Sequence, residues 1–167
     1  HDPNAVVLIS EQAHVSLEKA GRVMGLRPDG IRRIPVDSRG CMLLPALQEQ
    51  LQWLQQHDRA CIAVVATAGT TVRGAIDPIP ALAKLCREHE LWLHVDGAIG
   101  AVFALCPGTA KLMDGLGQAD SITVNPQKLL GIAKTSSLLL VRDQSALQQT
   151  FHTGLPYMEP AFAGAHG

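Results

Sequence analysis

The chain has 167 residues and a mass of 17.8 kDa, a length that fits one domain. Apolar residues make up 47% and charged residues 17% of the sequence, which argues against disorder of the whole chain. The formal net charge is −1, so a basic nucleic-acid-binding surface is not indicated. Every apolar run is shorter than the roughly 18 residues that a membrane-spanning helix needs.

Short apolar runs, each typical of a buried strand, alternate with helical patterns along the chain. Strands are expected at residues 6–9, 31–36, 61–67, 91–95, 121–124 and 138–141. Helices are expected from Ser16, near Pro45, from Asp77-Pro78 and from about Gln144, with a short helical stretch ending near Leu116. Because the strands alternate with helices and look apolar on both faces, the order predicts an α/β fold of three layers with a mostly parallel central sheet.

Three residues are candidate N-caps of these helices, namely Ser16, Asp77 and Asp143. The first helix is expected to bury one apolar stripe, made of Leu17, Ala20 and Met24. The four cysteines, at positions 41, 61, 86 and 106, lack CxxC spacing. We expect them to be reduced and mostly buried as small apolar side chains in a cytoplasmic protein.

Polar side chains follow four of the expected strands, where ligands of parallel α/β sheets bind. They comprise His14, the Thr67–Thr71 segment, the Asp96–Ala98 segment and the Asn125–Lys128 segment. Asp96 and Lys128 lie about one βαβ unit apart, so they are expected side by side after neighbouring strands. A lysine that forms a Schiff base and a carboxylate that keeps a pyridinium nitrogen protonated suit a pyridoxal 5'-phosphate (PLP) site.

The amino-acid sequences of these segments identify a protein family more specifically than the spacing of the segments does. The chain contains, in order, SEQAHVSLEKA from Ser10, ATAGTTVRGAIDPI from Ala66, WLHVDGAIGA from Trp92 and ADSITVNPQKLLG from Ala119. Together they resemble the group II PLP-dependent amino acid decarboxylases, and most closely the glutamate and cysteine-sulfinate decarboxylase branch. The resemblance runs from about residue 7 to residue 142.

The resemblance implies a fold and a domain organisation. The family has the aspartate-aminotransferase type of fold, called fold type I, and forms homodimers with active sites at the subunit interface. Residues 1–150 would be the central part of the PLP-binding large domain. Residues 151–167 would be a Gly/Pro/Ala-rich tail, mobile or leading to further segments. We expect the chain to be a piece of a longer protein, and to be inactive by itself.

The resemblance also implies a role for each site residue. Lys128 matches the Schiff-base lysine and Asp96 the partner of the pyridinium nitrogen. His14 matches the histidine that stacks on one face of the cofactor ring, and Ala98 would lie against the other face. The remaining matches are Thr71, a threonine near the ring substituents, and Asn125, a residue beside the phosphate that Ser121 or Thr123 would assist.

Several features depart from the family pattern. Gln127 stands where most members have histidine, and a glutamine cannot take up a proton. Gly97 replaces the usual alanine, which looks tolerable. The upstream phosphate-cradling segment, the mobile loop with its catalytic tyrosine, and the small domain with its substrate-binding arginine are all absent from these 167 residues.

Other polar residues have simpler interpretations. His94 is expected to be a core or supporting histidine, and Thr70-Thr71 could be no more than a tight turn. Arg32-Arg33 is expected at a solvated edge. The remaining histidines, at positions 57, 89, 152 and 166, lack partner spacing, so they are expected to face solvent and no metal site is predicted.

The expected function is decarboxylation of an L-amino acid, with an acidic substrate such as glutamate, aspartate or cysteine sulfinate favoured. One alternative is another PLP reaction on the same scaffold, as in an aldolase, another lyase or an aminotransferase. A second alternative is a non-catalytic fragment or degenerate paralogue that acts as a structural module. The expected partners are a small-molecule amino acid substrate and a second copy in a homodimer, with neither nucleic acid nor membrane.

Overall fold

A six-stranded sheet forms the centre of the protein in the computed structural model, which describes residues 2, 4–133 and 136–151. The strands are β1 (Val6–Ser10), β2 (Ile31–Ile34), β3 (Cys61–Thr67), β4 (Trp92–Asp96), β5 (Ser121–Val124) and β6 (Leu138–Val141). Their order in the sheet is β2-β1-β3-β4-β5-β6. The first five strands are parallel and β6 is antiparallel to β5, which confirms the mostly parallel sheet.

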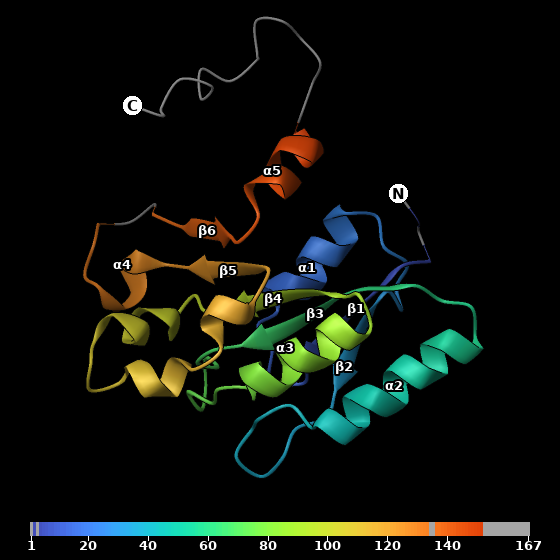
Figure 1. Cartoon of the computed structure of the whole chain (residues 1–167), viewed down its shortest axis with the longest axis horizontal. Helices are drawn as coiled ribbons and strands as arrows, with labels where there is room; N and C mark the ends of the chain where they lie inside the picture. The colour runs from blue at the N-terminus through green and yellow to red at the C-terminus, as the bar shows by residue number, and fades with distance from the viewer. Residues whose placement is uncertain (1, 3, 134–135, 152–167) are drawn as a thin grey trace, which may run out of the picture.

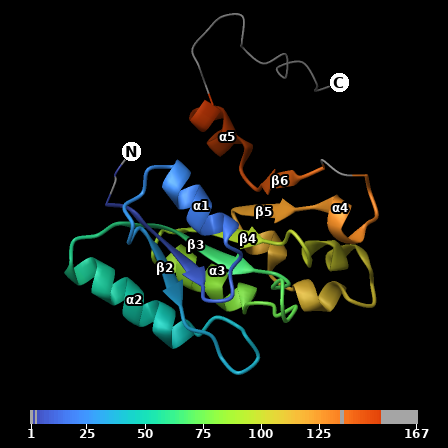
Figure 2. The same cartoon turned by 180° about the vertical axis from the view of Figure 1, so that it is seen from behind.

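Helices lie on both faces of this sheet, so the three-layer arrangement is also confirmed (Figure 1). The helices are α1 (Ser16–Val23), α2 (Leu44–Gln56), α3 (Ile79–Glu88), α4 (Pro126–Leu129) and α5 (Gln144–Phe151). Three short 3-10 turns, η1 (Ala101–Leu105), η2 (Ala110–Met113) and η3 (Leu116–Gln118), connect β4 to β5. The view from behind shows α1 on the face opposite α2 and α3 (Figure 2). The tail expected at 151–167 lies, from residue 152 onward, outside the described residues.

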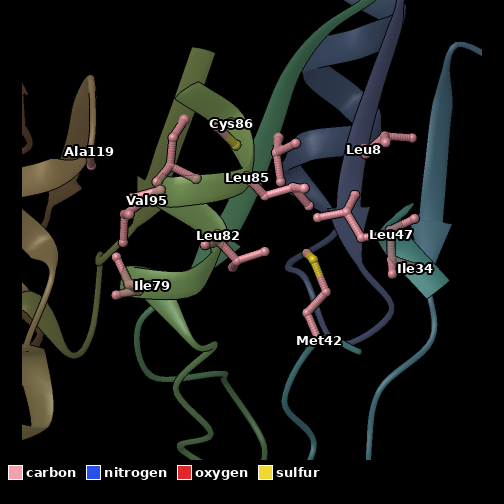
Figure 3. Packing of buried hydrophobic residues seen from close by; sticks show 14 of the residues in the cluster. Leu8, Ile34, Met42, Leu47, Ile79, Leu82, Leu85, Cys86, Val95 and Ala119 are labelled. Atoms are coloured by element: carbon pink, nitrogen blue, oxygen red, sulfur yellow. The ribbon is translucent and has the colours of Figure 1, made fainter. Parts of the chain in front are cut away.

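The main hydrophobic core lies between the sheet and the helices α2 and α3 (Figure 3). Leu47, Leu51 and Leu54 of α2 are buried there, at the helical spacing seen in the sequence. Buried side chains of α3 meet the sheet residues Leu93 and Val95. Each large aliphatic side chain removed from water contributes about 1.5–3 kcal/mol, so this layer supplies much of the stability.

The opposite face of the sheet changes character from one side to the other. Under α1 it is apolar, with Val7, Ile9 and Val65 buried. On β4 and β5 the same face is polar, because residues two apart along a strand share a face. The side chains there are His94, Asp96, Ser121 and Thr123. The expectation that the strands are apolar on both faces is therefore right for β1 but wrong for β4 and β5.

Several local expectations need correction. The second strand ends at Ile34, before Pro35, because proline cannot donate to the ladder. Ser16 is the first residue of α1, and Val15 occupies the N-cap position. The Ser16 hydroxyl bonds His14 Nδ1 at 2.9 Å and does not cap the helix. Ala20 and Met24 are exposed, and α1 instead buries Gly21 against Ile31.

The expected cap of α3 is also wrong, while the cap of α5 is confirmed. Asp77 is not the N-cap, because α3 begins at Ile79 and Pro78 occupies the N-cap position. The Asp77 carboxylate instead accepts the backbone N–H groups of Met42 and Thr67. Asp143 does cap α5, since Oδ1 accepts the Ser145 N–H at 2.9 Å.

The four cysteines are free, but only one of them is fully buried. Cys86 lies in the core, where burial raises the pKa of its thiol to about 12. Burial likewise raises the pKa of the half-buried Cys61 to about 11. Cys106 is exposed, so the expectation of burial is wrong for that residue. Within the described ranges, the helices are too short or too polar to cross a membrane.

Two helices end with the same backbone motif but without glycine. After α3, Leu91 N–H binds Cys86 C=O and Glu90 N–H binds Arg87 C=O, which is the Schellman pattern. Glu90 is left-handed there with φ +54°, and Asp58 takes the same place after α2 with φ +51°.

We expect Glu90→Gly and Asp58→Gly each to raise the free energy of unfolding by about 0.5–1 kcal/mol, because glycine adopts positive φ without a Cβ clash. Urea unfolding measures the change. As a control, Gln55→Gly within α2 should lower stability by about 1 kcal/mol. A loss of stability in both cap variants would contradict the prediction.

Candidate active site

A cavity of about 280 Å³ opens at the carboxyl ends of the parallel strands, close to the lower limit of about 300 Å³ for small-molecule sites. Its walls come from the segments after β1, β3, β4 and β5 and from the start of α1. All six residues predicted from the sequence line it, namely His14, Thr71, Asp96, Ala98, Asn125 and Lys128. The tertiary structure thus brings together side chains that are more than 110 residues apart in the chain.

Asp96 occupies the centre of a polar row across the sheet. It is the last residue of β4, and its register partners are Thr67 on β3 and Thr123 on β5. All three residues line the cavity. Carboxylate Oδ1 accepts the backbone N–H of Ala98 at 3.2 Å, which fixes the side chain at the start of the following turn. Among the described residues that line the cavity, Asp96 is the only carboxylate.

Lys128 lies in the short helix α4, directly after β5. Because β4 and β5 are adjacent and parallel, Asp96 and Lys128 reach the same edge of the sheet, as their spacing predicted. The helix begins after Asn125, whose Oδ1 accepts the Ser137 hydroxyl at 3.0 Å. This bond uses the amide oxygen, so the amide nitrogen of this cavity residue keeps its hydrogens to donate.

His14 lines the cavity from the segment just before α1. Its Nδ1 accepts the Ser16 backbone N–H at 3.3 Å and lies 2.9 Å from the Ser16 hydroxyl. Since a backbone N–H only donates, Nδ1 is the accepting nitrogen of this ring, and Nε2 is the nitrogen left to donate. The imidazole is thereby held in one orientation.

The two threonines after β3 have different roles in the structure. Thr70 is buried, and its hydroxyl accepts the Ala75 N–H at 3.0 Å, so it closes the turn. Thr71 is exposed and lines the cavity. Gly100 holds this turn against the segment after β4, because its N–H donates to Ala68 C=O at 2.9 Å. A Cβ on Gly100 would lie only 2.4 Å from that oxygen.

We therefore expect Gly100→Ala to force these two cavity walls apart and to lower the free energy of unfolding by about 1–3 kcal/mol. Gly108→Ala is the matched control, because a Cβ there would meet nothing within 4 Å, and it should change stability by less than about 0.5 kcal/mol. Thermal or urea unfolding of both variants checks the difference. Equal stabilities would show that the close approach of the walls is unimportant.

Three further cavity residues are Thr67, from the segment expected to bind a ligand, Thr123, expected beside the phosphate, and His94, expected only in the core or in a supporting place. Burial lowers the pKa of His94, against the opposing charge of Asp96. The sequence signal for Thr67, His94 and Thr123 is the alternation of side chains along each strand, which places them on the same face of the sheet as Asp96. Ser121, an expected helper at the phosphate, is 5% exposed and does not line the cavity, because its hydroxyl is bonded to Trp92 and His94.

Gly97 and Gln127, the two residues that depart from the family pattern, have different surroundings in the structure. A Cβ on Gly97 would lie 2.5 Å from Ala101 Cβ, so glycine is the residue that this packing accepts. Gln127 lies in α4 but is not part of the cavity wall. Its Oε1 is buried without a hydrogen-bond partner among the described residues.

The remaining predictions concern residues outside the cavity. Arg33 forms an ion pair with Glu18 at 2.8 Å, and the Arg32 guanidinium lies over the Trp53 ring at 4.0 Å. Both arginines belong to β2, the edge strand of the sheet. His57 and His89 are exposed, whereas His152 and His166 lie outside the described residues. Over residues 2, 4–133 and 136–151, three or more potential metal ligands do not come together.

Fold and site together define a class of protein. It is a three-layer α/β protein whose parallel sheet presents an amine, a carboxylate and an imidazole at one edge, an arrangement suited to a lysine-bound cofactor. The family model described as "Pyridoxal-dependent decarboxylase conserved domain" matches residues 3–164. The chain belongs to this family.

Individual relatives agree with this assignment. The chain is 39% identical over 150 residues to cysteine sulfinic acid decarboxylase of Rattus norvegicus, covering 90% of this chain and 30% of that protein. It superposes on the crystal structure of mouse CSAD with a TM-score of 0.86 and 37% identity, covering 90% of this chain and 32% of that one. For Oryza sativa TDC with PLP the TM-score is 0.82 and the identity 31%, over 87% and 31% of the two chains. The chain therefore spans about a third of the length of its relatives.

Proposed function

We propose that the protein to which this chain contributes is a PLP-dependent decarboxylase of an L-amino acid. One observation carries the proposal: Lys128, Asp96 and His14, three functional groups from distant parts of the chain, line one cavity at the carboxyl edge of the sheet. Family membership supports the same reaction class. The runner-up, another PLP reaction on this scaffold, uses the same residues and differs in its product.

The cavity residues fit the cofactor chemically. Thr67 is 4% exposed, and its hydroxyl has no hydrogen-bond partner among the described residues, so the wall holds a polar group that a ligand could satisfy. The Asn125 amide supplies donors for an anion. When bound, PLP supplies an electron sink for the pair of electrons left when the carboxylate departs from Cα.

Each residue of this chain has a distinct task in the proposed reaction. Lys128 Nζ would attach the cofactor and later reclaim it from the product. The Asp96 carboxylate would hold a proton on the ring nitrogen, because a nearby negative charge favours the protonated form. His14 and Ala98 would contact the two faces of the ring, and Thr71 would contact its substituents.

We further propose an acidic amino acid as the substrate, with cysteine sulfinate, glutamate and aspartate as the candidates. The rat relative named above, a cysteine sulfinic acid decarboxylase, supports this choice. A homodimer is part of the same proposal. Exposed apolar side chains next to the cavity, Leu129 beside Lys128 and Leu138 beside Ser137, support a partner surface at this edge. Sedimentation analysis of the full-length protein tests the dimer, and a monomer at micromolar concentration would contradict it.

Borohydride trapping tests the PLP assignment. The full-length protein is mixed with PLP, its visible absorbance is recorded, and the sample is reduced, digested and analysed by mass spectrometry. We expect a pyridoxyl group on Lys128, and none after Lys128→Ala. Carbon dioxide release from a panel of acidic amino acids then distinguishes decarboxylation from keto-acid formation by an aminotransferase.

Two results would overturn the proposal. The absence of both the visible band and the label in the full-length protein would favour a degenerate, structural paralogue. A label on Lys128 with keto-acid formation and no carbon dioxide would favour the aminotransferase alternative.

A further inference from the structure

A chain of hydrogen bonds lies behind the cavity, on the polar face of β4 and β5. Trp92 Nε1–H donates to Ser121 Oγ at 2.8 Å. The same oxygen lies 2.8 Å from His94 Nδ1, and His94 Nε2 lies 3.1 Å from Thr123 Oγ1. Four side chains are thus connected from the exposed indole of Trp92 to a threonine in the cavity wall.

The direction of these bonds follows from the donors and acceptors available. An indole N–H can only donate, so Ser121 Oγ accepts from Trp92. Ser121 is 5% exposed, and leaving its one hydroxyl hydrogen unpaired would cost free energy. Among the described residues, the acceptor within reach of that hydrogen is His94 Nδ1. His94 is consequently neutral with its hydrogen on Nε2, which donates to Thr123.

The Thr123 hydroxyl is the member of this chain of hydrogen bonds whose hydrogen has no acceptor within the chain. Its hydroxyl oxygen already accepts from His94, so its own hydrogen is free to be donated. Thr123 is the register partner of Asp96, and both residues line the cavity. The Asp96 carboxylate, bonded to the Ala98 N–H through Oδ1, keeps acceptor capacity on its other oxygen.

We propose that His94 is a positioning residue, locked by Trp92 and Ser121, that makes Thr123 a hydrogen-bond donor into the cavity beside Asp96, where it helps to position the group that this carboxylate binds. This inference rests on the proposed function of Asp96. Burial lowers the pKa of His94, which agrees with a neutral ring. The register neighbours of His94, Val65 and Ser121, are uncharged, and the other titratable side chains lining the cavity are His14, Asp96 and Lys128.

Isosteric variants of the full-length protein test the proposal. Thr123→Val removes the hydroxyl at nearly constant volume, Thr123→Ser retains it, and His94→Leu removes the group that orients it. Two readouts are measured, the dissociation constant of PLP and the pH midpoint of the visible band of the bound cofactor. A structural role alone would change thermal stability without moving that midpoint.

We expect Thr123→Val and His94→Leu to weaken PLP binding by about tenfold, as for one hydrogen bond to a charged group. The pH midpoint should move by about one unit, the equivalent free energy. Thr123→Ser should stay within about twofold of the wild type, a fraction of one hydrogen bond. Equal dissociation constants and midpoints in all folded variants would overturn the proposal.

The proton position can be tested without the cofactor. In protein labelled with 15N-histidine, we expect His94 to show an unprotonated Nδ1 and a protonated Nε2 at neutral pH. A protonated Nδ1 would overturn the inference even if PLP binds to Lys128. If the wild type binds no PLP but the tautomer is as expected, the proposed function fails while the hydrogen-bond chain stands.

Discussion

Asp96→Asn in the full-length protein is expected to reduce the turnover of its amino acid substrate by about 10²–10³-fold, as when one preorganised electrostatic group is removed from an active site. Asparagine keeps the size of the side chain and can still accept the Ala98 N–H through its amide oxygen. It loses the negative charge that would hold a proton on the cofactor ring nitrogen. The substitution therefore removes the negative charge while keeping the shape of the side chain.

Steady-state kinetics and borohydride labelling check this prediction together. The variant should still be labelled on Lys128, because that lysine comes from a different element, α4. Asp114→Asn is a suitable control, since Asp114 is exposed and is not one of the residues that line the cavity, and it should leave turnover unchanged. Turnover of Asp96→Asn within threefold of the wild type would contradict the role assigned to the carboxylate.

Asp77→Ala is expected to lower the free energy of unfolding by roughly 2–6 kcal/mol, because it leaves two buried backbone donors unpaired at about 1–3 kcal/mol each. Asp77 is 3% exposed. Its Oδ1 accepts the Met42 N–H at 2.6 Å and its Oδ2 the Thr67 N–H at 2.7 Å. Burial raises the pKa of this carboxyl, while the two N–H groups act in the opposite direction.

The Asp77 effect should reach the cavity as well, since Thr67 is part of its wall. Chemical unfolding of Asp77→Ala and Asp77→Asn gives the stability change, and the asparagine variant should lose less because one acceptor remains. Asp114→Ala, an exposed position, should stay within about 0.5 kcal/mol of the wild type. A similarly small loss in Asp77→Ala would show that the two buried N–H groups find other partners.

Most strands and helices were predictable because their signals are local. The leucines at helical spacing in α2 and the apolar β-branched run of β1 encode their elements within a few residues. The helix starts were less predictable. Asp77 precedes a proline in the way an N-cap does, yet its carboxylate binds residues 10 and 35 positions away, which a local pattern cannot reveal.

The sequence by itself determined the alternation of strands and helices, the parallel sheet and the six candidate site residues. Parallel strands present their carboxyl ends at one edge, so residues that follow them must gather there. Tertiary structure alone decided the strand order, and with it the neighbours Thr67 and Thr123 on either side of Asp96. It also decided that α1 covers the β1 side of the sheet and leaves the polar face of β4 and β5 to the cavity. These features depend on pairing between segments far apart in the chain, and short-range residue patterns do not encode such pairing.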